Sequence, residues 1–204
     1  FGGEACNINI VIYNGCLIAG NIEFFYKLFL IITFFSQSVV DVDCKKIDFS
    51  VVPDTVTTIG SNSFFGCAGL SEITIPNSVV SIGYGAFSYC SKLTSVTIGN
   101  SVKSIGENAF ERCEDLNKVT FSEGSQIQSI SSSAFDNCKN LKTVIFGDNG
   151  QFTTIGTPFR GNKTIETVVF GKNSKMTSIS KYAFYDCFYL KSVTIPKTVT
   201  EIGQ

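Results

Sequence analysis

Residues 82–98 read Ile-Gly-Tyr-Gly-Ala-Phe-Ser-Tyr-Cys-Ser-Lys-Leu-Thr-Ser-Val-Thr-Ile, and close copies of this stretch recur along the chain. The leading isoleucine returns at positions 59, 82, 105, 130, 155, 179 and 202, so successive copies begin 23 to 25 residues apart. A fixed period in the twenties, with aliphatic residues at constant offsets, is typical of a solenoid in which each repeat forms one coil. We therefore expect a stack of coils with parallel strands.

Each copy contains two stretches that read as strands. Residues 93–98 end in an alternating stretch whose last apolar pair, Val96 and Ile98, has the period of two expected of a strand with one buried face. Residues 79–82 form a second, shorter extended stretch, and the Asn-Ser and Gly-Asn pairs after the first stretch supply turn chemistry. The Ala-Phe-x-x-Cys segment is too short for a long helix, so we expect a helical turn or a 3₁₀ turn there.

Three positions of each copy are expected to fill the interior. Neighbouring strands lie about 4.7 to 4.9 Å apart, so each inward position becomes a row of like side chains. The aromatic row is Phe64, Phe87, Phe110, Phe135, Phe159 and Phe184, and the aliphatic row is Leu70, Leu93, Leu116, Leu141, Ile165 and Leu190. The cysteine row is Cys67, Cys90, Cys113, Cys138 and Cys187. Strand spacing holds neighbouring cysteines somewhat farther apart than a disulfide prefers, which predicts buried free thiols.

The repeat divides the chain into two parts. Residues 1–43 do not follow it, whereas residues 44–204 hold half a repeat, six repeats and the start of a seventh, which predicts truncation at the C-terminus. Lys27 precedes an apolar run, and residues 28–38 fit either a signal peptide or a cap on the solenoid. Cys6 and Cys16 lie outside the array and would be able to pair in an exported protein.

The composition argues against several classes of function. The 16 basic and 17 acidic residues give a formal net charge of −1, so no electrostatic footprint for nucleic acid is present. The chain has no histidine, which removes Ser-His and Cys-His nucleophile pairs, and it has no Cys-x-x-Cys pair for structural zinc. Carboxylates such as Glu107 and Glu111 are scattered over exposed positions. We therefore predict no catalytic, cofactor or metal site, and a role in binding.

The six copies resemble the BspA-like, or treponemal-type, leucine-rich repeat. They are called units one to six, and they run over residues 59–75, 82–98, 105–121, 130–146, 155–170 and 179–195. The resemblance covers residues 44–204. It implies a leucine-rich-repeat solenoid of the α/β horseshoe class, rich in β-structure, in a cell-surface or secreted protein. It also implies a protein partner and adhesion to host matrix or to other cells. The alternative that remains open is a ligand-sensing or carbohydrate-binding repeat domain.

Two surfaces are candidates for partner binding. The first, called the strand face, consists of the outward positions of the long strands and a lysine beside them: Glu72, Thr74, Ser95, Thr97, Lys118, Thr120, Lys142, Thr143, Thr167, Ser192 and Thr194. These residue types also suit any strand, so their recurrence has a purely structural explanation too. A threonine ladder that orders water is a remote third hypothesis, because Ile145 and Val169 interrupt the stripe.

The second surface, called the loop patch, comes from three connections that are two residues longer than the others. They follow the third, fourth and fifth copies, at residues 122–126, 147–151 and 171–175. Insertions at one place in successive repeats stack together, and they often form the binding side of a solenoid. The alternative is neutral drift at a surface where solvent tolerates a longer loop. The candidate residues are Glu123, Asp148, Asn149, Lys172 and Lys175.

The fifth copy departs from the pattern. It is one residue short before Phe159, and Asn162 stands where cysteine is expected. Asn162-Lys163-Thr164 is also a glycan acceptor sequence, so an outward turn would expose Asn162 for glycosylation, whereas the alternative is a distorted turn. If Asn162 lies inside, we expect it to find a hydrogen-bond partner or solvent.

Overall fold

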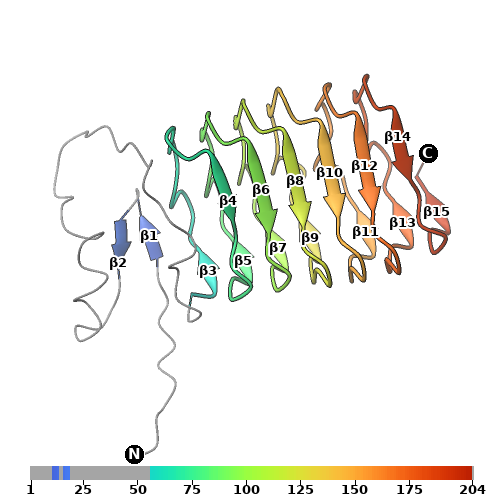
Figure 1. Cartoon of the computed structure of the whole chain (residues 1–204), viewed down its shortest axis with the longest axis horizontal. Coiled ribbons are helices and arrows are strands. Elements are labelled where there is room, and N and C mark those ends of the chain that lie inside the picture. Colours follow the sequence, from blue (N-terminus) through green and yellow to red (C-terminus); the bar gives the residue numbers. More distant parts are fainter. Residues whose placement is uncertain (1–10, 14–15, 19–55, 204) are drawn as a thin grey trace, which may run out of the picture.

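The computed structural model describes residues 11–13, 16–18 and 56–203. From residue 56 onward the chain winds into a stack of coils whose strands run parallel, as Figure 1 shows, so the predicted solenoid is confirmed. Before it, β1 (Val11–Tyr13) and β2 (Cys16–Ile18) pair as an antiparallel hairpin. The signal-like residues 28–38 and Cys6 lie outside the described residues, as do the side chains of the hairpin. The part of the chain that the structure describes holds no helix able to cross a membrane.

One wall of the stack is a six-stranded parallel sheet, called the large sheet. Its strands, in spatial order, are β4 (Glu72–Thr74), β6 (Ser95–Ile98), β8 (Lys118–Phe121), β10 (Thr143–Phe146), β12 (Thr167–Phe170) and β14 (Ser192–Thr194). Buried and more exposed residues alternate along each central strand, as a period of two requires. The sheet therefore has one face in the core and one in solvent.

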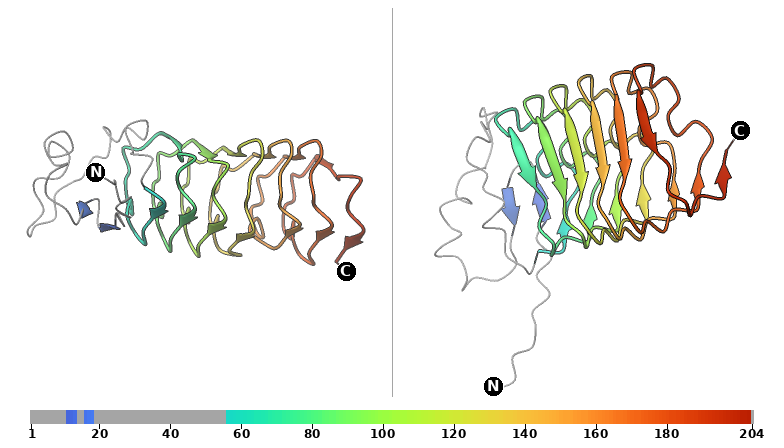
Figure 2. Two further views of the ribbon diagram at one scale, coloured as in Figure 1. Left: turned by 90° about the horizontal axis from the view of Figure 1, so that it is seen from below. Right: turned by 45° about the vertical axis from the view of Figure 1, so that its right-hand side comes forward.

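A second wall is made of two-residue strands. They form two separate sheets: β3 (Thr58–Ile59), β5 (Ser81–Ile82), β7 (Ser104–Ile105) and β9 (Ser129–Ile130) in one, and β11 (Thr154–Ile155), β13 (Ser178–Ile179) and β15 (Glu201–Ile202) in the other. Figure 2 shows both walls of the stack from two further sides. The wall is interrupted between β9 and β11, although the large sheet runs on past them.

The third wall, called the turn wall, holds the Ala-Phe-x-x-Cys segments, and it contains no helix. In the first unit the N–H groups of Asn62, Phe64 and Gly66 donate to carbonyls of the next coil at 2.7–2.8 Å. The N–H groups between them bond three residues back instead. Asn62 and Gly66 have left-handed backbone angles, with φ of 56° and 72°. This alternation points every second N–H out of the coil, so the expected helical or 3₁₀ turn is replaced by a hydrogen-bonded ladder of turns.

The aromatic row forms a stack through the centre of the coils. Phe64, Phe87, Phe110 and Phe135 follow one another at centroid distances of 5.0–5.2 Å, with their rings within 6° of parallel. A second stack that the sequence analysis did not anticipate joins Phe121, Phe146 and Phe170 at 4.6 and 5.0 Å. The aliphatic row is buried up to Ile165, and Leu190 is partly buried. The core is therefore built from ladders of like residues, as the repeat predicts.

The cysteine row is buried, and its thiols donate hydrogen bonds between coils. Cys90, Cys113 and Cys138 donate to the carbonyl of the phenylalanine one coil earlier at 3.1–3.2 Å, and Cys187 does so at 3.4 Å. These four thiols are free, as predicted. The prediction is wrong for Cys67, which is disulfide-bonded.

Between units four and five the stack is incomplete along a line called the seam, where residues 128–138 face residues 153–162. Elsewhere the residue after each short strand donates to the coil before, as Gly106 N–H does to Ile82 at 2.9 Å. In the described part of the chain Gly156 N–H makes no such bond to Ile130, and no turn-wall bond joins the two units. The Phe135 and Phe159 rings lie 5.5 Å apart at 26°, a looser contact than in the stack before. The large sheet and the loops after it continue unbroken across the seam, and just before the sheet Thr164 Oγ1 donates to Leu141 O at 2.9 Å.

Candidate functional site

The structure gathers the predicted strand face onto the solvent side of the large sheet. Strand register aligns one row as Glu72, Ser95, Lys118, Thr143, Thr167 and Ser192. The second row is Thr74, Thr97, Thr120, Ile145, Val169 and Thr194. All these side chains are exposed or half-buried. Parallel pairing in register is what places residues of the same repeat position side by side, so the sequence period determines the composition of the surface.

Charge on the strand face is concentrated near its centre. Lys142 immediately precedes β10, whose first residue Thr143 pairs with Lys118 of β8, so the two lysines belong to neighbouring coils. Neither lysine forms an ion pair with a described residue. Farther along, Lys191 contacts Glu166 at 2.6 Å, and this hydrogen bond lowers the pKa of the Glu166 carboxyl. The charge of Lys142 also lowers the pKa of Glu166, but neither Lys142 nor Lys118 is held in a close ion pair with a described carboxylate, so both can meet a carboxylate from outside.

The three long connections also stack, so the residues of the loop patch lie together. Asn149 Nδ2 donates to Glu123 Oε1 at 3.0 Å, and Lys172 N–H donates to Asp148 Oδ1 at 2.7 Å. Several polar groups of the patch are therefore already hydrogen-bonded to the neighbouring coil. The side chains of Lys172 and Lys175 are exposed.

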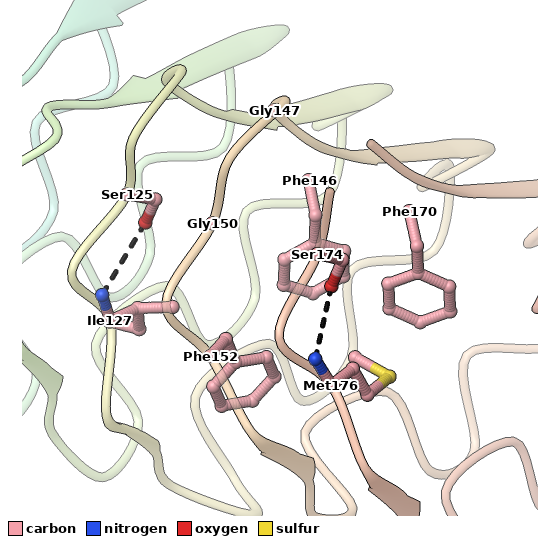
Figure 3. A pocket seen from close by; sticks show the side chains of 9 residues that line it. All are labelled: Ser125, Ile127, Phe146, Gly147, Gly150, Phe152, Phe170, Ser174 and Met176. Atoms are coloured by element: carbon pink, nitrogen blue, oxygen red, sulfur yellow. Dashed lines mark hydrogen bonds between the residues drawn. The ribbon is translucent and has the colours of Figure 1, made fainter. Parts of the chain in front are cut away.

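A small cavity of about 10 Å³ lies near the loop patch. Figure 3 shows that Phe146, Phe152 and Phe170 line it, with the Ser125 and Ser174 hydroxyls on either side of Gly150. Each hydroxyl accepts a hydrogen bond from the N–H two residues on, at 3.4 and 3.3 Å. Gly150 occupies the equivalent position in its own connection, but it has no hydroxyl that could accept a hydrogen bond from the Phe152 N–H. The volume is at the lower limit for one water molecule, so this cavity is a packing defect rather than a ligand site.

Asn162 does not turn outward. Its side chain is only 4% exposed, and its Nδ2 has no hydrogen-bond partner. The expected partner is therefore absent, and the condition for a glycan at this position, an exposed amide, is not met. The equivalent cysteine of unit six donates to Phe159 O one coil back, and at the seam no such bond forms from Asn162 to Phe135 O.

Burial raises the pKa of several thiols. It raises the pKa of Cys187 to about 11, and it raises those of Cys113 and Cys138 well above the ordinary value of 9.0. These thiols therefore stay protonated, and they are weak nucleophiles at neutral pH. No group of three or more Cys, Asp or Glu side chains in the described ranges is placed to hold a metal ion.

Exposed aromatic side chains on the turn wall were missed by sequence reasoning. Phe65 and Tyr89 pack together at 5.2 Å, and Arg112 lies 5.4 Å from the Tyr89 ring. Tyr182 and Tyr185 meet edge to face at 5.5 Å, with Arg160 over both rings. The repeat does not fix which residue stands at these positions, so the pattern did not indicate them. The one available signal was an aromatic residue at a position where the repeat predicts a polar, exposed side chain.

Comparison with known proteins agrees with this architecture. The sequence matches the family described as BspA type leucine rich repeat region, in six copies over residues 42–159 and 154–204. The crystal structure of the T. pallidum leucine-rich repeat protein is similar, with 23% identity, a TM-score of 0.55 and coverage of 72% of this chain and 67% of that one. At this identity the likeness shows the fold alone. No curated protein matches the chain.

A leucine-rich cell surface protein from Faecalibacterium prausnitzii shares 30% identity, with a TM-score of 0.51. The similarity covers 72% of this chain but 39% of that protein, so the chain spans well under half of its length. The family match extends over most of the repeat array, and the described coils have the geometry that the repeat requires. The chain belongs to the BspA-type leucine-rich repeat family.

Proposed function

We propose that this chain is a non-enzymatic interaction scaffold, at the cell surface or secreted, that adheres to a protein of the extracellular matrix or of another cell through its strand face. The observation that carries the proposal is the register of the large sheet, which joins six coils into one exposed surface. The interior of the solenoid is filled by ladders of apolar side chains, so a partner can be contacted only through the outer walls.

The central lysines give this face a partner chemistry. Lys118 lies in β8 and Lys142 lies immediately before β10, and neither forms a close ion pair with a described carboxylate. Around them are hydroxyl side chains, which donate and accept hydrogen bonds. An acidic segment of a partner protein would pair with them and hydrogen-bond along the rows. The similar F. prausnitzii protein is described as a cell surface protein, which supports an extracellular location for this chain too.

Binding of the purified chain to a panel of immobilised extracellular matrix proteins tests the proposal. The double variant Lys118→Glu/Lys142→Glu reverses charge at the centre of the strand face, and we expect its affinity to fall about tenfold or more. Lys172→Glu/Lys175→Glu makes the same change in the loop patch, and we expect a smaller effect. The binding should also weaken as salt is raised, because the lysines are exposed.

The matched control is Lys103→Glu/Lys197→Glu, which changes two exposed lysines outside both surfaces. It carries the same change in net charge, so it separates a local contact from a general electrostatic effect. Absence of binding to the whole panel contradicts the proposal, and so does an equal loss in the control. A loss confined to the Lys172/Lys175 variant assigns the contact to the loop patch and overturns the strand-face assignment.

A further inference from the structure

The seam opens on the turn wall as a cleft between units four and five. Its lining residues Ser132 and Thr157 follow β9 and β11, two strands that Figure 1 labels. Its volume is about 460 Å³. Asp136 and Asn137 line one side, while Thr157, Arg160 and Tyr185 line the other. Small-ligand sites typically have volumes of about 300 to 1,000 Å³, so the cleft has room for a ligand of modest size.

The cleft exists because the ladder of turns is missing at this step. In unit three Arg112 N–H donates to Asp136 O at 2.9 Å, whereas the equivalent N–H of Asn137 has no hydrogen bond among the described residues. A Cβ built on Gly106 would lie 2.9 Å from backbone of the preceding coil, but one built on Gly156 would meet nothing within 4 Å. The coils are therefore separated here, and a backbone donor is left available at the wall of the cleft.

The lining mixes hydrogen-bond acceptors and donors. Asp136 and Asp186 supply carboxylate oxygens, and Arg160 supplies a guanidinium group. Ser132 and Ser133 add hydroxyls, which both donate and accept. A ligand that meets this lining needs many groups of both kinds close together, and a run of hydroxyls on a compact ring has that property.

An aromatic ring stands at one side of the cleft. Tyr185 is 47% exposed, and its position is supported by Tyr182 at 5.5 Å and by Arg160 at 5.3 Å from its centroid. Aromatic faces pack against apolar C–H surfaces and keep a polar tip for hydrogen bonding. A pyranose ring presents C–H groups on its faces and hydroxyls around its edge, so the ring and the polar lining suit the same molecule.

Charge and geometry argue against other ligand classes. Two carboxylates against one guanidinium disfavour an anion, and the described residues contain no cluster able to hold a metal ion. Partial burial and nearby Glu111 raise the pKa of the Asp136 carboxyl, with Arg160 opposing this effect. A half-buried carboxylate beside another acid weakens the fold, and such groups are concentrated at functional sites.

From these observations we propose that the seam cleft is a carbohydrate subsite that holds one sugar unit of a neutral glycan. Tyr185 covers one face of the sugar, and Asp136, Asn137 and Arg160 hydrogen-bond its hydroxyls. The site lies on the turn wall, whereas the proposed protein contact uses the strand face, so the two functions are separable.

Saturation-transfer NMR with four uncharged trisaccharides tests this subsite, one built from each of glucose, mannose, galactose and N-acetylglucosamine. A single sugar unit in an open cleft gives a Kd on the order of millimolar, so each probe is titrated to about 10 mM. We expect saturable binding of at least one probe, and a loss of about tenfold or more in Tyr185→Ala and Asp136→Ala. Ser132→Trp, at an exposed position of the lining, should block the cleft by its bulk while it leaves Tyr185, Asp136, Asn137 and Arg160 unchanged.

The matched control is Phe65→Ala, because Phe65 is an exposed aromatic residue at the same repeat position as Tyr185 but away from the seam. It should bind the sugar like the parent chain, and so should the Lys118→Glu/Lys142→Glu variant. The proposal is overturned if no trisaccharide binds by 10 mM, or if Phe65→Ala and Tyr185→Ala lose equal affinity. Binding that disappears in about 0.5 M NaCl also overturns it, because a neutral glycan contact is insensitive to screening.

Discussion

At the level of single residues, the cysteine position links each coil to the coil before it. The side chain is buried, and its thiol reaches the phenylalanine carbonyl one coil earlier in units two, three, four and six. A serine there would bury a more polar group, and an alanine would lose the bond. In these four units the recurrence of cysteine therefore has a structural cause other than a disulfide or a metal, whereas Cys67 of the first unit is disulfide-bonded.

Stability is expected to fall when the pH rises above about 9. The pKa of the Cys187 thiol is about 11 in the fold, against an ordinary value of 9.0 for an unfolded chain. Below pH 9 both states keep the proton, so the contribution of this thiol to stability is full there. Between pH 9 and 11 only the unfolded state loses the proton, so stability declines by at most about 1.4 kcal/mol per pH unit for each such thiol.

Urea unfolding midpoints at pH 7, 9 and 10.5 measure this decline. Cys187→Ala should lower the midpoint at pH 7 and flatten its dependence on pH. A dependence that is unchanged in the variant would show that other groups cause the decline. At pH 8, iodoacetamide should leave Cys90, Cys113 and Cys138 unmodified until denaturant is added, because they are buried.

Asn162→Cys is expected to stabilise the protein. The change removes a buried amide nitrogen that has no partner, and such a group costs about 1 to 3 kcal/mol. Circular dichroism during urea unfolding would report an increase of about 1 kcal/mol or more in the free energy of unfolding. The reciprocal change Cys113→Asn should lower that free energy, and the idea fails if both substitutions act in the same direction.

At the level of elements, the long connections contain two glycines with different physical roles. A Cβ on Gly147 would lie 2.7 Å from the Glu123 nitrogen, so close approach of two loops requires glycine there. A Cβ on Gly150 would lie 3.6 Å from Gly147 O, which is ordinary contact. Only the first glycine is dictated by the stacking of the coils.

Gly150→Ser should therefore stabilise the protein by about 1 kcal/mol. The new hydroxyl is placed to accept from the Phe152 N–H, as Ser125 and Ser174 do for their own neighbours, and serine also restricts the unfolded chain. Thermal unfolding would show a higher Tm for this variant and a lower Tm for Gly147→Ser. Equal shifts for both positions would contradict the assigned roles.

The period of the sequence predicted the large sheet, the short strands and the buried rows, because each depends only on which residues recur. A helical turn or a 3₁₀ turn was expected in each segment of the turn wall, and none forms, since the left-handed residues Asn62 and Gly66 send alternate N–H groups to the next coil. The seam was visible only as a missing residue before Phe159 and an asparagine at position 162. Whether a shortened turn closes or leaves a gap depends on backbone geometry, which a residue pattern does not specify.

The strand face followed from the sequence because outward positions are fixed by alternation. The cleft at the seam did not, because it is formed by residues from three units that become neighbours only when a rung of the ladder is absent. Ser133, Thr157 and Tyr185 occupy variable positions of the repeat, and nothing in their order along the chain indicates a common site.

At the level of the whole molecule, the seam divides two of the three walls. Amide hydrogen exchange should reveal this division, because backbone groups without hydrogen bonds exchange faster. The N–H groups of Asn137 and Gly156 are expected to exchange more rapidly than the equivalent groups of Arg112 and Gly106, which are bonded to neighbouring coils. Mass spectrometry of peptides from these segments gives the comparison, and equal protection would contradict the gap.

The unbroken large sheet has a mechanical consequence at this joint. Units one to four and units five and six are joined through the large sheet but separated along the other two walls. The solenoid therefore bends most easily at the seam, about an axis within the large sheet. A sugar unit that contacts both sides of the proposed subsite would restrain this bending, so the solenoid would be stiffer when the cleft is occupied. The shortened turn of the fifth copy would then set where along its length this solenoid bends.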